Sequence, residues 1–163
     1  IRRRREKAHR QFHCRFERMK GDGTLFTAWM DSVLRGSTQI TCAKDQRFSP
    51  ISVDDVAGAI VATIDNDCIG TYHIAGPKAY SRVELLMMLL EKLNERIRLD
   101  VNVKTCNIND FELSEVRPID VSMSPSKFIR DTGMQFQETD KMCDRIIDEY
   151  LFKNESEPIR YGD

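Results

Sequence analysis

Residues 45–60, DQRFSPISVDDVAGAI, place a polar turn directly before a well-marked helix start. Ser52 is an N-cap residue with Asp55 three positions later, which is a variant of the capping box. Asp54 and Asp55 would lie in the first helical turn, where compensation of the helix dipole explains them better than acid/base chemistry does. The apolar stripe of this helix consists of Val56, Ile60 and Ile64, with Ala57 and Val61.

Strand and helix patterns follow one another around this stretch. Residues 39–43, QITCA, alternate and predict a short strand, and residues 70–76, GTYHIAG, predict a second strand bounded by glycines. Ser81 and Glu84 form a second capping box, before a helix that ends near residue 93. Residues 101–107 are a third strand candidate. The order strand, helix, strand, helix over residues 39–93 favours an α/β fold.

A histidine and two methionines in this region could have functional roles, but we interpret them as structural residues. His73, on the predicted second strand, is interpreted as a hydrogen-bonded core histidine rather than a catalyst. Met87 and Met88, on the helix that follows, are interpreted as core filler because methionine adapts to irregular space.

Helices are also predicted toward both ends of the chain. Residues 25–35 carry apolar side chains at helical spacing, and Gly36 is a suitable C-terminal cap. Ser124 as N-cap, Pro125 at the first helical position and Gly133 as terminator bracket a short helix. A last helix is predicted from about Thr139 to Lys153.

Composition favours a single soluble globular domain in the cytoplasm. The chain has 163 residues, of which 40% are hydrophobic and 31% are charged. The longest apolar run, residues 85–90, is far shorter than the roughly 20 residues of a membrane helix. Five cysteines at wide, irregular spacing suggest neither a disulfide framework nor a zinc site, so reduced and mostly buried thiols are predicted.

The first 20 residues are strongly basic, with nine lysines and arginines against two glutamates. Such a run can bind nucleic acid, but a solvated face or mobile arm is the more common explanation, and no aromatic stacking platform accompanies it. His9, His13 and Cys14 have a spacing that suits one helix face, but no second pair of metal ligands follows. The preferred interpretation is therefore an arm without a metal site, and nucleic acid is not the expected partner.

Three stretches, in their order and spacing, resemble one known family. They are DQRFSPISVDDVAGAIVATI at 45–64, GTYHIAGPKAYSRVELLMML at 70–89 and VRPIDVSMSPSKFIRDTGMQF at 116–136. Together they are similar to the C-terminal half of extended short-chain dehydrogenases/reductases, in particular the dTDP-4-dehydrorhamnose reductase-like proteins. The resemblance implies an α/β fold that is the C-terminal part of a Rossmann-type enzyme, with helices packed on a few short, mostly parallel strands.

The resemblance does not extend to the cofactor and catalytic motifs of that family. The sequence has no glycine-rich turn of the form G-x-x-G-x-x-G, which lets the backbone approach a dinucleotide pyrophosphate. It also has no Tyr-x-x-x-Lys pair, in which lysine lowers the tyrosine pKa for proton transfer. We therefore expect no catalytic residue and no bound cofactor in this chain alone, which would be inactive. NAD or NADP would belong to the complete enzyme.

The resemblance also implies a set of substrate-side residues. A nucleotide-sugar substrate carries a diphosphate, which a planar arginine fork binds well. The family positions occupied by Arg47 and Arg117 imply contacts to that diphosphate. The alternatives are that Arg47 is a solvated turn residue and that Arg117 pairs with Glu115 or Asp120. The remaining predicted contacts, at the turn before the helix, are Gln46, Ser49 and Pro50, of which Ser49 and Pro50 are expected mainly to shape the turn.

The resulting hypothesis divides the chain into a basic arm (1–23), a substrate-binding region (24–153) and a flexible tail (154–163). The substrate-binding region would belong to an NAD(P)-dependent nucleotide-sugar reductase and would need a Rossmann half, from the same polypeptide or from a partner chain. The competing hypothesis is a non-catalytic binding module, as in the regulatory subunit of methionine adenosyltransferase, which resembles the same reductases.

Overall fold

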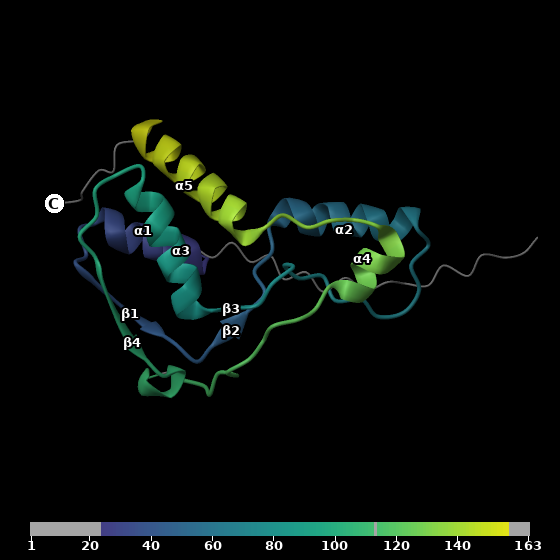
Figure 1. Ribbon diagram of the computed structural model, residues 1–163, viewed down its shortest axis with the longest axis horizontal. Coiled ribbons are helices and arrows are strands. Elements are labelled where there is room, and N and C mark those ends of the chain that lie inside the picture. The colour runs from purple at the N-terminus through teal and green to yellow at the C-terminus, as the bar shows by residue number, and fades with distance from the viewer. Residues whose placement is uncertain (1–23, 113, 157–163) are drawn as a thin grey trace, which may run out of the picture.

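Short strands alternate with helices in the computed structural model, which describes residues 24–112 and 114–156 (Figure 1). Strand β1 (Gln39–Ala43) pairs in parallel with β4 (Asn102–Cys106), from Gln39 opposite Asn102 to Ala43 opposite Cys106. The helical segments between them supply the long crossover that a parallel pair needs. Strand β2 (Arg47–Phe48) pairs antiparallel with β3 (Tyr80–Ser81). The predicted α/β class, with helices on a few short strands, is confirmed.

The main hydrophobic core lies among three helices and β1. These helices are α1 (Leu25–Leu34), α3 (Arg82–Asn94) and α5 (Thr139–Ser156), which gather on one side of the β1 and β4 pair in Figure 1. The side chains of Met30, Leu89 and Ile147 are fully buried there. Lys92 of α3 donates a hydrogen bond of 2.6 Å to Asp144 of α5 and ties these two helices together at the surface.

A second, smaller core lies between α2 (Val53–Asp65) and α4 (Ser126–Thr132). Its buried members are Ala59, Phe128 and Phe136, and the rings of the two phenylalanines stack at 5.7 Å. Tyr72 packs edge-on against Phe128 at 6.0 Å. The segment that contains Tyr72 is thereby held against the two helices.

The predicted helix boundaries agree closely with the structure. Ser52 accepts a hydrogen bond of 3.1 Å from the Asp55 amide, but the Asp55 carboxylate accepts from the Gln137 amide at 3.1 Å instead of closing the capping box. The capping box of Ser81 and Glu84 is complete. Helix α4 starts at Ser126 with Pro125 as its N-cap, so the prediction of Ser124 as N-cap and Pro125 as first helical residue is wrong by one position. The helix ends at Thr132, and Gly133 is its C-cap, as predicted, with a positive φ of 72°. Helix α5 begins at Thr139 as predicted and continues to Ser156.

The prediction of a strand over residues 70–76 is wrong. Within the described part of the chain this segment has no strand partner, and the strand that precedes α3 is the two-residue β3. The side chains of Tyr72 and Ile74 both pack against the smaller core, so the alternating pattern indicates correctly which side chains face inward. His73 consequently points outward and is exposed, and its interpretation as a core histidine is wrong.

Two further predictions of burial need correction. Met87 is 51% exposed on the outer face of α3, whereas Met88 packs against the main core as predicted. On α2, Ala57, Ile60, Val61 and Ile64 of the predicted apolar stripe are exposed, and only Val56 is partly buried. Helix α2 therefore rests on its small residues rather than on its large ones.

The described cysteines are free thiols, as predicted. Cys42, Cys68 and Cys143 are buried, and Cys106 is partly buried. Burial raises the pKa of Cys42 and of Cys143 to about 11, so both are protonated at neutral pH. None of the helices that the structure describes is long and apolar enough to cross a bilayer. The predictions about the basic arm, including His9, His13 and Cys14, fall outside the described residues.

The capping box gives a pH-dependent contribution to stability. Hydrogen bonds from Ser81 lower the pKa of Glu84 in the folded protein. The charged carboxylate therefore stabilises the fold at pH values above the pKa of glutamate in the unfolded chain, which is about 4.3. This stabilisation is lost as the pH falls through the lower pKa that Glu84 has in the folded protein. We expect Glu84→Gln to lower the free energy of unfolding at pH 7 by about 0.5 kcal/mol relative to the wild type. Urea titrations should show this difference disappear toward pH 3; a constant difference would contradict the prediction.

Candidate functional site

Arg47 and Arg117 lie on neighbouring segments of backbone. The Arg47 amide donates to Ile119 O at 2.7 Å, and the Val121 amide donates to Arg47 O at 3.1 Å, which joins β2 to residues 119–121. The Arg47 guanidinium donates to Ala79 O at 3.1 Å and is exposed, so it is anchored rather than freely solvated. Arg117 is exposed and forms no ion pair with any described residue, including Glu115 and Asp120.

Gln46 has a structural position rather than an exposed one. It is buried at 4% exposure, donates to Pro118 O at 3.2 Å and accepts from Arg82 Nη1 at 3.2 Å. Burial lowers the pKa of the Arg82 guanidinium, and the nearby charge of Arg117 lowers it further. Gln46 thus orients Arg82 and the backbone directly after Arg117, and three arginines, Arg47, Arg82 and Arg117, lie around residues 46–47 and 117–118.

Ser49 and Pro50 form the turn that leads from β2 to α2. The Ser49 hydroxyl accepts from the Met123 amide at 3.2 Å, and the Ser49 carbonyl accepts from the Gly76 amide at 3.2 Å. The carbonyl of Pro50 lies so close to Gly76 that a β-carbon there would be 1.9 Å from it. The turn is therefore fixed by two segments distant in sequence, in agreement with a shaping role for both residues.

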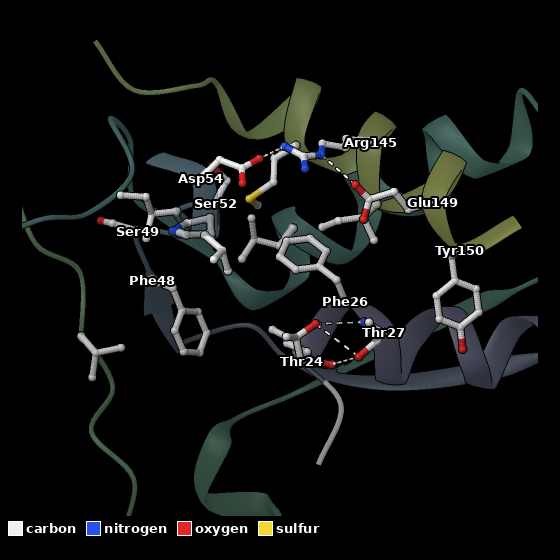
Figure 2. Close-up of a pocket in the computed structure, with 18 residues that line it drawn as sticks. Thr24, Phe26, Thr27, Phe48, Ser49, Ser52, Asp54, Arg145, Glu149 and Tyr150 are labelled. Atoms are coloured by element: carbon white, nitrogen blue, oxygen red, sulfur yellow. Dashed lines mark hydrogen bonds and ion pairs between the residues drawn. The ribbon is translucent and has the colours of Figure 1, made fainter. Parts of the chain in front are cut away.

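A cavity of about 650 Å³ opens between this turn, the start of α1 and one face of α5 (Figure 2). Its walls are mainly apolar and aromatic, as is usual for small-molecule sites. Ser49 and Pro50 line it. Phe48 lines it too, whereas Arg47 does not, because consecutive residues of β2 point to opposite sides. Arg117, which lies outside β2, does not line it either. The principal apolar walls are Phe26, Phe48, Ile51, Met142, Ile146 and Tyr150.

One end of the cavity is charged. Figure 2 shows Arg145 of α5 between Asp54 of α2 and Glu149 of α5. Arg145 Nε donates to Glu149 Oε1 at 2.8 Å, and its Nη1 donates to Asp54 Oδ2. The hydrogen bond with Glu149, and to a smaller extent the hydrogen bond with Asp54, raise the pKa of Arg145. Because Asp54 and Glu149 share one guanidinium, each carboxylate keeps oxygens at the cavity wall that can accept further hydrogen bonds. Such acceptors suit the hydroxyl groups of a ligand and not a negatively charged phosphate.

The structure therefore divides the predicted site residues into two groups. Ser49 and Pro50 line the cavity, whereas Gln46, Arg47 and Arg117 do not. Sequence reasoning missed the charged end of the cavity. The spacing of Arg145 and Glu149 was visible as an i, i+4 helix pair, but nothing in the sequence joined it to Asp54, which lies 91 positions away.

The N-termini of α2 and α3 do not fit the pyrophosphate of a nicotinamide cofactor. Such a group needs a glycine-rich turn at a helix N-terminus with a free positive dipole. The N-terminus of α2 carries Asp54 and Asp55, and that of α3 carries Glu84. These carboxylates occupy the favourable positions and would repel a diphosphate. Among the described residues there is also no group of three or more possible metal ligands.

Comparison with known proteins identifies the fold. Among solved structures, the chain is similar to the dTDP-4-dehydrorhamnose reductase of Clostridium acetobutylicum, with 18% identity, a TM-score of 0.68 and coverage of 81% of this chain and 45% of that one. The reductase of Bacillus anthracis in complex with NADP gives 21% identity, a TM-score of 0.64 and coverage of 80% and 44%. A hypothetical dTDP-4-dehydrorhamnose reductase of Sulfolobus tokodaii gives 25% identity, a TM-score of 0.55 and coverage of 73% and 41%.

The chain thus spans less than half the length of these structures. A search of curated proteins gave no match. The family model described as "RmlD substrate binding domain" matches residues 15–152, which is most of the sequence. The order of elements, the turn before α2 and this match agree, and the chain belongs to the RmlD substrate binding domain family.

Proposed function

We propose that this chain is the substrate-binding portion of an NAD(P)-dependent nucleotide-sugar reductase. The observation that carries the proposal is that Arg47 and Arg117 are exposed on adjoining backbone segments, where β2 meets residues 119–121, and that the residues after Arg47 line an apolar cavity. Arg117 and Arg47 would bind the substrate diphosphate, for which a guanidinium fork is the best-suited donor. Gln46, Ser49 and Pro50 would hold the turn between these arginines and the cavity.

The cavity would receive the sugar. Its walls offer apolar faces to a sugar ring, and the spare oxygens of Asp54 and Glu149 can accept hydrogen bonds from hydroxyl groups. In the complete enzyme, the hydride for the carbon of a 4-keto group would come from NADH or NADPH, and a proton would reach the carbonyl oxygen. Neither the cofactor site nor the proton donor is assigned to this chain, which would position the substrate only.

Removal of the Arg117 guanidinium should weaken substrate binding. We expect Arg117→Ala to reduce the affinity of the full gene product for dTDP-glucose, titrated in the presence of NADP, by about tenfold to a hundredfold, which matches the loss of a charge-assisted hydrogen bond. Isothermal titration calorimetry gives the dissociation constants. Arg98→Ala is the matched control, because Arg98 is exposed before β4 and distant in sequence from the proposed site. Equal affinities of the two variants, or no binding to the wild type, would contradict the proposal.

A non-catalytic binding module is the second candidate. It is favoured by the exposed apolar side chains of α2, of which Val53, Val61 and Ile64 are 65%, 56% and 61% exposed. This candidate predicts a stable complex with another protein and no affinity for nucleotide sugars. Mass measurement of the purified complex, together with the calorimetric titration above, separates the two functions.

A further inference from the structure

Arg82, the first residue of α3, is a cation for which the described part of the chain supplies no carboxylate partner. The residue is partly buried, and its Nη1 donates to the neutral amide oxygen of Gln46 at 3.2 Å. Burial lowers the pKa of Arg82, and the positive charge of Arg117 nearby lowers it further. A partly buried charge beside a like charge is unfavourable unless an anion joins the pair.

The pairing of β2 with β3, which lie side by side in Figure 1, shows which way Arg82 faces. Arg47 lies opposite Ser81, and the Arg82 amide extends this pairing by one step, since it donates to Gln46 O at 2.9 Å. Residues directly opposite one another face the same side, so Arg82 faces as Gln46 does. Side chains alternate along a strand, so Gln46 faces as Phe48 does and Arg47 faces the other way. Because Phe48 lines the cavity, Arg82 lies on the cavity side of the strand pair.

Helix α3 gives the same placement. Leu85 lines the cavity and follows Arg82 by three positions, so the two side chains share one face of the helix. The buried Gln46 also donates to Pro118 O at 3.2 Å, so one amide group joins Arg82 to the segment that carries Arg117. Arg82 is not itself part of the cavity wall. It therefore lies beside the cavity, together with a second arginine.

We propose that Arg82 is a further substrate-binding residue, which together with Arg117 binds the diphosphate of the nucleotide sugar while the sugar lies in the cavity. This inference rests on the proposed function. A diphosphate carries negative charge on two linked groups, and each group suits the planar fork of one guanidinium. Its binding would also supply the anion that the two like charges lack.

Arg47 is less suited than Arg82 to this position. Its guanidinium already donates to Ala79 O at 3.1 Å. Its charge also contributes to lowering the pKa of Glu84 and of Asp120, so two carboxylates balance it. We therefore expect the loss of Arg82 to weaken diphosphate binding more than the loss of Arg47 does.

The binding test uses the polypeptide encoded by the whole gene, titrated with dTDP-glucose in the presence of NADP. Arg82→Gln should reduce the affinity by about tenfold to a hundredfold, which matches the loss of a charge-assisted hydrogen bond. Arg82→Lys keeps the charge without the fork and should recover part of this loss. Arg98→Gln is the control, because Arg98 is exposed before β4, and it should bind as the wild type does.

Thermal unfolding separates a binding role from a structural one. Without ligand, the midpoint of Arg82→Gln should equal or exceed that of the wild type, because the substitution removes a charge without a partner. A residue that only supports the fold would give a lower midpoint. Inorganic pyrophosphate should raise the midpoints of the wild type and of Arg98→Gln, and it should raise that of Arg82→Gln less.

Three results would overturn the inference. They are an affinity for dTDP-glucose that is equal in Arg82→Gln and Arg98→Gln, a lower midpoint of ligand-free Arg82→Gln, and a pyrophosphate effect that is absent from the wild type or undiminished in Arg82→Gln. Any of them, found with an affinity that depends on Arg117, rejects the role of Arg82 alone. A wild type that does not bind dTDP-glucose, but that pyrophosphate stabilises through Arg82, rejects the nucleotide-sugar function and retains the anion site.

Discussion

Gly76→Ala should destabilise this protein by about 3 kcal/mol or more, although it adds a single methyl group. A β-carbon at Gly76 would be 1.9 Å from the Pro50 carbonyl oxygen and 3.0 Å from the Pro50 carbonyl carbon. Both are backbone atoms, and the Gly76 amide is bound to Ser49 O at 3.2 Å, so neither segment can move without loss of that hydrogen bond. Urea unfolding followed by circular dichroism measures the change.

Gly58→Ala is the matched control for this prediction. A β-carbon at Gly58 would be 3.0 Å from Met134 Cε, the end of a flexible side chain that can rotate away. Gly58 lies inside α2, where alanine is favoured over glycine by roughly 0.5–1 kcal/mol. We expect this variant to be within about 1 kcal/mol of the wild type. Similar losses for the two variants would show that crowding against backbone is not the cause.

Because Ser49 and Pro50 line the cavity, Gly76→Ala also tests the link between the turn and binding. A shift of the turn would alter the cavity wall at the same time as it lowers stability. Affinity for dTDP-glucose should therefore fall in Gly76→Ala and remain in Gly58→Ala.

The local signals in the sequence predicted the helices well, because the interactions that start and stop a helix lie within a few residues. Ser52, Ser81 and Gly133 each act at the position expected. The prediction failed at residues 70–76, because a strand requires hydrogen bonds from a neighbour and a single segment does not reveal whether that neighbour is present. The alternation of Tyr72 and Ile74 reports only which way the side chains face.

The candidate site was only partly predictable for a related reason. The resemblance to reductases gave Arg47 and Arg117, and the structure joins their backbones through residues 119–121. The contact of Asp54 with Arg145 depends on how α2 and α5 pack, which no local pattern encodes. The apolar stripe of α2 was predicted correctly as a pattern, but its exposure was not predicted. Periodicity shows that a helix has an apolar face and does not show whether that face packs against the rest of the domain.

Phe128→Ala should cost about 3–5 kcal/mol, which is the usual range for a buried phenylalanine. Phe128 is fully buried, stacks on Phe136 and contacts Tyr72 edge-on. The smaller core has only two other fully packed members, Ala59 and Phe136, so little remains to collapse into the space. Phe128→Leu keeps most of the volume and should cost less than about 1.5 kcal/mol, which makes it the control.

The loss in Phe128→Ala should also be local, because the two hydrophobic cores have no buried residue in common. The main core among α1, α3 and α5 contains Met30, Leu89 and Ile147 and does not depend on Phe128. Hydrogen exchange should therefore show faster opening in α2 and α4, with the amides of α3 still protected. Equal acceleration in α3 would mean that the protein unfolds as one unit and that the smaller core has no independent stability.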